Sequence, residues 1–369
     1  MFRLRYLAMF GLLSAFVAAT AFAQEKKDPP KEAKKDDTKK EEPKKDDTKK
    51  EEPKKEEPKK DPPKAEPAGM NWKFTKDVSF YQKMDTNTEQ NIKVMGLDVT
   101  QKQEQTFYFK WTPLKQDGDK WEIRQEIEGL KMKIDIAGNP VSFDSTQENP
   151  AGGANSALAE FFKALKGSSF TLTLNTKTMK VEKVEGREAF LTKLSTANPQ
   201  LEPLLKKILS EDALRQMADP TFGITPPAGK KAGDTWENTS ALNLGPIGTY
   251  NNKYKYTWKG PFDKNKDLEQ ISVETTLTYT APTEADPALP FKIKASTLTT
   301  KEKQDPGTIL FNTKVGRLES SDMKLAISGS LTIEIGGNTT QVELFQNQST
   351  KIDVSDKSLL PAPADPKKQ

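Results

Sequence analysis

The sequence predicts an α+β protein dominated by a long curved antiparallel sheet, with a few helices from the middle of the chain packed on one face. Two observations predict this class. Apolar and polar residues alternate with a period of two through most of the chain after residue 69, which is typical of strands with one buried and one solvated face. Between residues 156 and 218, apolar residues instead recur at helical spacing.

The expected strands are bounded by Gly-, Asn- or Asp-containing turns, which supply the positive φ values that hairpins need. The clearest runs are 105–113, 120–128, 131–137, 141–144, 170–174, 179–184, 330–335 and 340–346.

Four helices are expected in the middle of the chain, over 156–166, 188–194, 201–209 and 211–218. Ser210 is a suitable N-cap for the last of them, because its hydroxyl can accept a bond from an otherwise unpaired backbone amide. The Asp219-Pro220 step ends that helix.

The first 23 residues have the features of a secretory signal peptide. Two arginines precede an apolar run over residues 6–20, and an A-x-A motif ends at Ala23. We therefore expect cleavage between Ala23 and Gln24, and export to the periplasm or the extracellular medium. The apolar run is shorter than the roughly 20 residues that span a bilayer, so we expect no membrane span after cleavage.

Residues 24–68 form a low-complexity tether of Lys, Glu, Asp and Pro, in which KKDDTKKEEP occurs twice in succession. Such a segment buries too little apolar surface to fold. Because its opposite charges cancel over distance, we interpret it as a disordered spacer, with docking on an anionic surface as the alternative. The tail, 361–369, is also expected to be disordered.

Residues 69–360 are expected to form a single β-rich domain. An alternative of two β subdomains, 70–150 and 225–355, joined by the helical residues 155–220, stays open. We expect the protein to be a monomer.

Composition excludes several chemistries. The chain has no cysteine and no histidine, so thiolate nucleophiles, histidine bases and Cys- or His-ligated metals are excluded. Carboxylate pairs, Ser-Lys arrangements and oxygen-ligated metals remain. Lys and Arg number 57 against 53 Asp and Glu, with both signs interleaved, whereas nucleic-acid binding needs a basic patch. We expect no nucleic-acid partner, no cofactor and no enzymatic activity.

Residues 263–274 have the acidic spacing of a calcium-binding EF-hand loop. Leucine replaces glycine at the sixth position, and the following residues alternate as a strand. A polar hairpin tip is therefore the favoured interpretation. The calcium candidates are Asp263, Asn265, Asp267 and Glu274.

Two further motifs are interpreted structurally. Ser321 and Lys324 match the S-x-x-K spelling of penicillin-binding enzymes, but a strand there would place them on opposite faces. Gly233-Asp234-Thr235-Trp236 is read as a turn entering a strand, with Asp234 capping backbone amides and Trp236 in the core. An aromatic binding platform beside Asp234 is the alternative.

Aromatic residues form two stripes that either fill the core or line a ligand cavity. Core packing is the more common role of aromatic residues on a buried sheet face. The stripes consist of Phe107, Phe109, Trp111, Tyr254, Tyr256 and Trp258.

Three segments resemble a known family. They are an early β segment that begins with Trp72-Lys73-Phe74, the run LNTKTMKVEKVEGREAFLTKL (174–194) and the run PPAGKKAGDTWENT (226–239). Together they resemble DUF6263, a family of exported bacterial proteins of unknown function, and the resemblance implies no functional residues. The architecture is also similar to that of curved-sheet periplasmic carriers of lipids or lipoproteins.

Three functions remain open. The first is an exported, non-enzymatic envelope protein with a binding or structural role, carried on a flexible spacer, whose partner is an unknown envelope component. The second is a carrier of an apolar ligand, such as a lipid or an acyl chain, in a curved-sheet cavity. The third is a carboxylate-based hydrolase.

Overall fold

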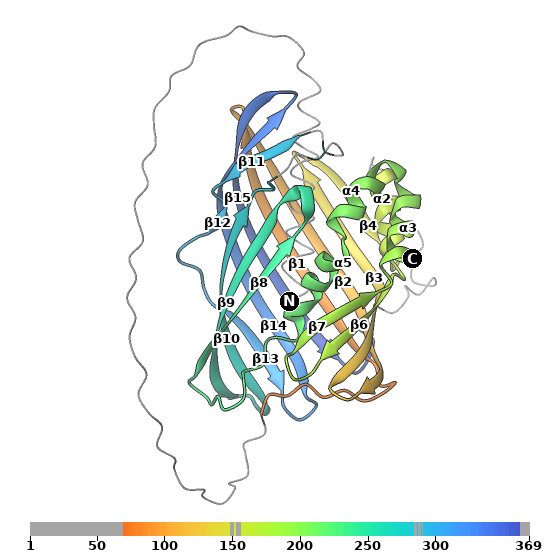
Figure 1. Cartoon of the computed structure of the whole chain (residues 1–369), viewed down its shortest axis with the longest axis vertical. Coiled ribbons are helices and arrows are strands. Elements are labelled where there is room, and N and C mark those ends of the chain that lie inside the picture. The colour runs from red at the N-terminus through yellow and green to blue at the C-terminus, as the bar shows by residue number, and fades with distance from the viewer. Residues whose placement is uncertain are drawn as a thin grey trace, which may run out of the picture.

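The computed structural model describes residues 69–147, 151–152, 156–283, 286, 289 and 291–361. The predicted signal peptide, the tether and all but one residue of the predicted tail lie outside the described residues. Within the described part, 15 strands form one antiparallel sheet, which curves strongly (Figure 1). The predicted fold class is confirmed.

The strands follow one path across the sheet, with four strands attached beside it. The path is β5 (Ala151–Gly152), β4 (Asn139–Asp144), β3 (Lys120–Ile136), β2 (Leu97–Asp117), β1 (Phe80–Val94), β15 (Asn338–Ser355), β14 (Arg317–Ile335), β12 (Thr299–Thr300), β10 (Asn265–Thr280), β9 (Thr249–Phe262) and β8 (Thr235–Asn243). The attached strands are β6 (Ser169–Asn175) on β3, β7 (Lys180–Glu185) on β6, β11 (Lys292–Ser296) on β14, and β13 (Gly307–Asn312) between β10 and β14.

The first and last long strands lie side by side near the middle of the sheet. β1 pairs with β15 from Tyr81 opposite Ser355 to Val94 opposite Val342. This pairing joins the strands before the helices to the strands after them, so both β blocks belong to one sheet (Figure 1).

Four helices occupy the middle of the chain, as predicted: α2 (Ser156–Leu165), α3 (Arg187–Ala197), α4 (Glu202–Ile208) and α5 (Glu211–Ala218). Short 3-10 turns accompany them: η1 (Pro199–Leu201), η2 (Asp219–Thr221) and η3 (Gly245–Ile247).

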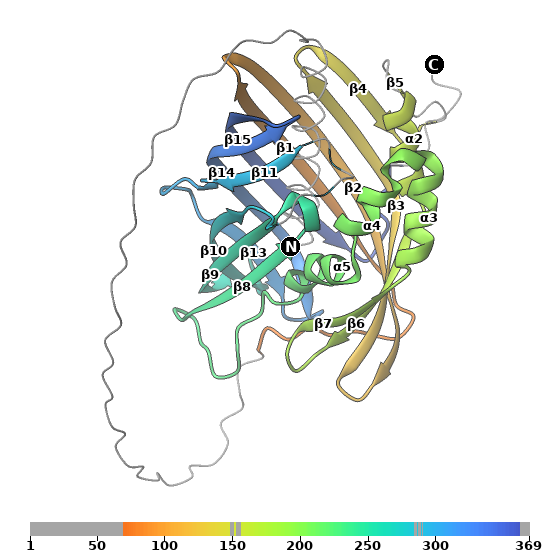
Figure 2. The same ribbon diagram turned by 45° about the horizontal axis from the view of Figure 1, so that its top comes forward.

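The predicted cap of α5 is confirmed, since the Ser210 hydroxyl accepts a hydrogen bond from the Ala213 amide at 3.1 Å. α5 contacts β7 on one side and β8 on the other. The helices therefore bridge the two ends of the curved sheet (Figure 2). No helix among the described residues is long and apolar enough to cross a membrane.

Each long strand has one buried face, which we call the inner face. In β1, residues 80, 82, 84, 86, 88, 90 and 92 are all buried. Apolar residues of this face and of the helices form a single hydrophobic cluster that spans both β blocks.

Two details of the predicted strands were wrong. The expected strands 120–128 and 131–137 are one strand, β3, because the ladder continues through a bulge at Glu128 between Ile127 and Gly129. The early strand does not begin at Trp72. The indole of Trp72 instead packs edge-on against Phe222 at a ring distance of 5.3 Å, and the strand begins at Phe80.

Candidate functional site

The inner face carries an unusual block of polar residues at the middle of the sheet. Nine glutamine and threonine side chains occupy inward positions on three neighbouring strands, and each is only 1–4% exposed. We call this block the glutamine–threonine patch: Gln101, Gln103 and Gln105 on β2, Thr86, Thr88 and Gln90 on β1, and Gln346, Gln348 and Thr350 on β15.

Strand register assembles the patch into three aligned rows. Each row takes one residue from each strand, such as Gln103–Thr88–Gln348. The positions that bracket the rows are apolar, with Met84 and Ile92 at the two ends of the β1 run. The patch is thus a polar island in an apolar surface, and it repeats the same three-position pattern on all three strands.

Some polar side chains of the patch form hydrogen bonds with one another. Gln90 donates from Nε2 to Gln346 Oε1, Gln346 Nε2 donates to Gln348 Oε1 at 3.2 Å, and the hydroxyls of Thr86 and Thr350 lie 3.3 Å apart. The two cross-strand contacts, together with the Gln346–Gln348 bond within β15, fix the side chains of β1 and β15 in place.

The β2 side of the patch remains incomplete. Neither polar side-chain atom of Gln105 has a hydrogen-bond partner among the described residues, nor has Gln103 Oε1. On the neighbouring strand β1, Gln90 Oε1 also has none in the described part of the chain. A buried polar group without a partner costs about 1–3 kcal/mol, and net protein stability is only about 5–15 kcal/mol. Buried water and bound ligands are two kinds of partner that satisfy such atoms.

The buried polar groups of the interior are uncharged. Every buried polar side chain among the described residues is a Gln, Asn, Ser or Thr. On β9, Asn252 Oδ1 and the Tyr250 hydroxyl also lack partners in the described part of the chain. Burial raises the pKa of Tyr250 well above its ordinary value, and the nearby Tyr279 raises it further. Tyr250 therefore stays neutral at physiological pH.

The aromatic stripes lie in the core, where the six side chains are 1–7% exposed. Phe107 and Phe109 stack at 5.7 Å, and Tyr254 and Tyr256 at 6.2 Å. The stripes lie on β2 and β9, in different halves of the sheet. Trp111 packs edge-on against Phe222, which belongs to the connection between α5 and β8.

The calcium candidates are not brought together. Asp263 lies in the two-residue turn between β9 and β10, while Asn265 Oδ1 accepts from the Asp267 amide at 3.0 Å. Glu274 lies nine residues along β10, about 30 Å from the turn at the usual strand rise, and pairs with Lys255 at 3.2 Å. No metal-binding group of three or more His, Cys, Asp or Glu residues occurs in the described ranges.

The remaining motifs have structural roles. Ser321 is buried and Lys324 exposed, on opposite faces of β14, so they cannot cooperate as a nucleophile and base. Asp234 Oδ2 accepts from the Lys231 amide at 3.0 Å, and Trp236 is buried against Tyr256 at a ring distance of 5.3 Å.

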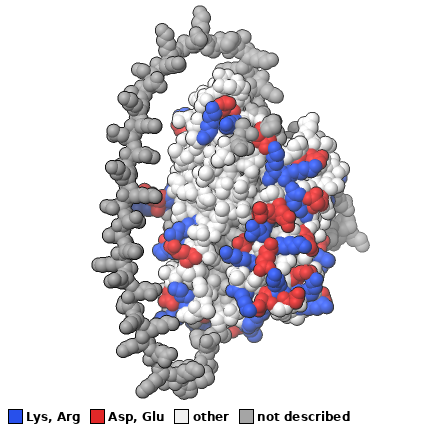
Figure 3. All heavy atoms as spheres, in the orientation of Figure 1, with Lys and Arg blue, Asp and Glu red and all other residues white. Residues whose placement is uncertain are grey.

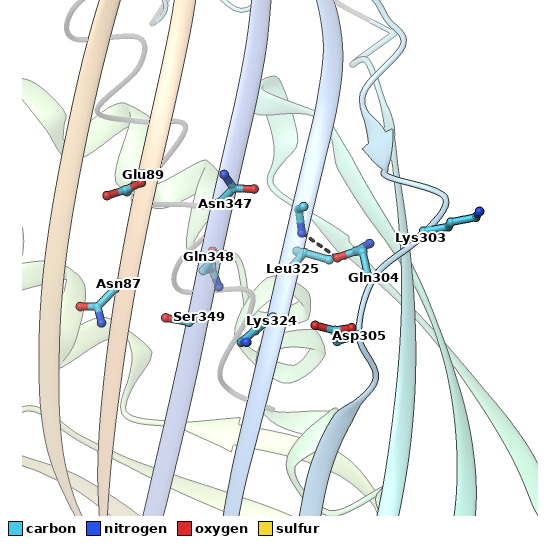
Figure 4. A pocket seen from close by; sticks show the side chains of 11 residues that line it. Asn87, Glu89, Lys303, Gln304, Asp305, Lys324, Leu325, Asn347, Gln348 and Ser349 are labelled. Atoms are coloured by element: carbon cyan, nitrogen blue, oxygen red, sulfur yellow. Dashed lines mark hydrogen bonds between the residues drawn. The ribbon is translucent and has the colours of Figure 1, made fainter.

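A groove of ≈ 650 Å³ lies on the outer face of β1, β15 and β14, beneath the segment 303–305 (Figure 4). Gln304 fixes that segment by accepting from the Ala326 amide at 2.6 Å. The groove holds two acids and two lysines, namely Glu89, Asp305, Lys303 and Lys324. Its balanced charges resemble the charged part of the face drawn in Figure 3, where both signs intermingle.

Sequence reasoning missed the glutamine–threonine patch, although a signal for it exists. Three segments share the pattern apolar, then three Gln or Thr at every second position, then apolar. They are Met84–Ile92, Val99–Phe107 and Leu344–Ile352. The repetition of one pattern in strands that pair with each other marks the patch.

The fold and the patch define an antiparallel β protein with an uncharged, polar island on its buried face. Residues 118–358 match DUF6263, a family of unknown function. The chain belongs to this family, which confirms the resemblance seen in its sequence.

No curated protein matches the chain. Among solved structures, it is similar to lipovitellin, in a structure of its lipid–protein interactions, with 8% identity and a TM-score of 0.41 over 79% of this chain and 26% of that chain. The chain thus spans about a quarter of the lipovitellin chain. An outer membrane channel from Pseudomonas putida F1 follows with 7% identity and a TM-score of 0.22 over 79% and 100% of the two chains. These likenesses are too weak to indicate function.

Proposed function

We propose that the protein is an exported, non-enzymatic binding module that holds a ligand against the inner face of its curved sheet. The glutamine–threonine patch carries this proposal. A folded protein that buries several unpartnered amide atoms gains stability when a ligand supplies their hydrogen bonds. The N-terminal signal and tether support export and display on a spacer.

The chemistry of the patch favours binding over catalysis. Carboxamides and hydroxyls donate and accept hydrogen bonds, but a carboxamide does not exchange a proton at neutral pH as a general acid or base must. Gln103 and Gln105 can therefore orient a ligand, and they offer no means of transforming it.

The patch also defines the ligand. Because the buried polar groups are uncharged, the bound part of the ligand carries hydrogen-bonding groups and no net charge. A plain acyl chain satisfies none of the amides, so the carrier alternative in its purely apolar form is disfavoured. A ligand with amide or hydroxyl groups between apolar ends matches the bracketing by Met84 and Ile92.

Native mass spectrometry of the mature protein, purified from its own cell envelope, tests the proposal. We expect a co-purifying small molecule that is lost on denaturation. The double variant Gln103→Leu/Gln105→Leu should reduce ligand occupancy at least tenfold, because it removes the unpartnered amides. Gln341→Leu, at an exposed position of β15, is the matched control and should keep wild-type occupancy.

Two outcomes would contradict the proposal. One is a wild-type protein that never carries a ligand, which would assign the amides to buried water. The other is equal occupancy in the double variant and the wild type. A double variant that is more stable than the wild type, and whose ligand occupancy is unchanged, would also contradict the proposal.

A further inference from the structure

A cleft of ≈ 670 Å³ opens beside the beginning of the described chain. Four segments form it: residues 69–72, the turn between β6 and β7, the loop 226–231, and the neighbouring strands β8 and β9. Its volume lies within the range of about 300–1,000 Å³ of small-molecule sites. The cleft shares no lining residue with the glutamine–threonine patch.

Three tryptophans contribute to the apolar surface of the cleft, and their neighbours hold them in place. Trp72 Nε1 donates to the Phe222 carbonyl at 3.1 Å, and Trp258 Nε1 donates to Glu269. Trp236 stacks on Tyr256 at 5.3 Å. Rigid indoles offer contact area to a ligand at little entropic cost.

Trp236 adds a hydrogen-bond donor without a partner. Its side chain is 7% exposed, and its Nε1 atom has no acceptor among the described residues. An indole N–H is a donor only, and a buried one usually finds an acceptor. The missing partner at the wall of a cleft points to an acceptor atom carried by a ligand.

The cleft also has a one-sided charge, unlike the rest of the surface. Among the described residues that line it are Lys177, Lys230 and Lys231 but no Asp or Glu. Lys177 pairs with Asp119. Lys230 and Lys231 lie exposed on the loop, and Asp234 reaches only the backbone amide of Lys231. Two cations beside an apolar floor attract an anion with an apolar body.

From these observations we propose that the cleft is a second binding site, for a small organic anion whose apolar body lies against the tryptophans. Its anionic group meets Lys230 and Lys231, and an acceptor atom takes the Trp236 N–H. The site is independent of the patch, because the patch binds uncharged groups and the cleft binds a charged one.

The test uses 8-anilinonaphthalene-1-sulfonate as the probe and the mature protein, with affinity measured by calorimetry. Lys230→Glu/Lys231→Glu should weaken binding at least tenfold through charge reversal. Trp236→Phe keeps a smaller aromatic side chain and removes the N–H, so we expect a loss of at least fivefold, of which one net hydrogen bond accounts for about fivefold. Lys301→Glu/Lys303→Glu, on a loop outside the cleft, is the matched control and should bind as the wild type does.

N-phenyl-1-naphthylamine, which lacks the sulfonate, separates anion recognition from apolar adsorption. We expect it to bind the wild type at least tenfold more weakly than the sulfonate does, and to bind the Lys230/Lys231 variant no more weakly than the wild type. Equal affinity of the two probes would overturn the proposal. So would an equal loss in the Lys301/Lys303 control, which would indicate general surface charge. Gln103→Leu/Gln105→Leu should leave probe binding unchanged, so this site and the patch can fail separately.

Discussion

Gly186 shows how one residue decides the path of the chain between β7 and α3. Its φ is +98°, and a Cβ atom there would lie 2.7 Å from the Ser169 carbonyl oxygen. A left-handed conformation costs a residue with a Cβ about 1–2 kcal/mol, and the contact with rigid backbone adds to this cost. Gly186 belongs to one of the segments that resembled DUF6263.

We expect Gly186→Ala to lower the free energy of unfolding by about 2–4 kcal/mol, measured by urea denaturation. Gly118→Ala is the control, because Gly118 also has positive φ but no atom within 4 Å of the added Cβ. The control should lose only about 1–2 kcal/mol. Equal losses in both variants would show that the contact with Ser169 contributes nothing.

Tyr250 gives the protein a defined response to alkali. Burial raises its pKa in the folded state, so the folded protein keeps this proton above pH 10 while the unfolded chain releases it. The stability that Tyr250 contributes is complete below the unfolded pKa of about 10 and falls as pH rises, by about 1.4 kcal/mol for each further unit.

Tyr250→Phe should therefore be less sensitive to alkali than the wild type. We expect the wild type to lose about 1.4 kcal/mol more than the variant between pH 8 and pH 11, measured by denaturation at both values. The variant also removes a buried hydroxyl without a described partner, so it should be no less stable at pH 8. An equal loss of stability in both proteins would mean that Tyr250 ionises in the folded protein as readily as in the unfolded chain.

At the scale of elements, helix α5 closes the gap between the two ends of the sheet. Its buried face, Ala213, Leu214, Met217 and Ala218, was readable from helical spacing, and so was its cap at Ser210. Its position between β7 and β8 could not be read from the sequence, because periodicity identifies an apolar face without identifying what that face packs against.

Ser210→Ala should destabilise the protein by about 1 kcal/mol, because the Ala213 amide loses its acceptor. Ser210→Asp keeps an acceptor at this position and adds charge favourable to the helix N-terminus, so it should stay within about 0.5 kcal/mol of the wild type. Thermal unfolding monitored by circular dichroism provides the comparison. A loss in Ser210→Asp as large as in Ser210→Ala would rule out capping as the cause.

Strand β1 was harder to predict than the helices, and the reason is physical. Hydrophobic alternation marks a strand only when its buried residues are apolar. In β1 three consecutive inward positions are Thr86, Thr88 and Gln90, so both faces of the strand read as polar, and the early β segment was placed only by its start, wrongly, at Trp72. The residues that make the patch a candidate site are those that removed the signal for the strand.

At the scale of the whole molecule, the chain closes on itself through its first and last long strands. The pairing of β1 with β15 joins residues more than 240 positions apart, and no local pattern in the sequence specifies such a partner. The sheet order was for this reason beyond sequence reasoning, although the individual hairpins, such as β14–β15 with its glycine turn, were predictable. A sheet with this much non-local pairing should fold slowly.

Continuous pairing across β1 and β15 also predicts that the two β blocks unfold together. Trp111 and Trp121 report on the first block, while Trp236 and Trp258 report on the second. In a Trp72→Phe background, which removes the fifth tryptophan of the chain, Trp236→Phe/Trp258→Phe and Trp111→Phe/Trp121→Phe each leave the tryptophans of one block as fluorescent probes.

In each variant, we expect the fluorescence transition in urea to coincide with the transition seen by far-ultraviolet circular dichroism, because neither block can keep its central edge without the other. Each variant serves as its own control, so a shift in stability from the lost indoles does not affect the comparison. Fluorescence that changes at a lower urea concentration than circular dichroism in one variant would instead support two subdomains joined by the helices. Such a result would mean that the β1–β15 ladder, despite its length, separates before the blocks that it joins.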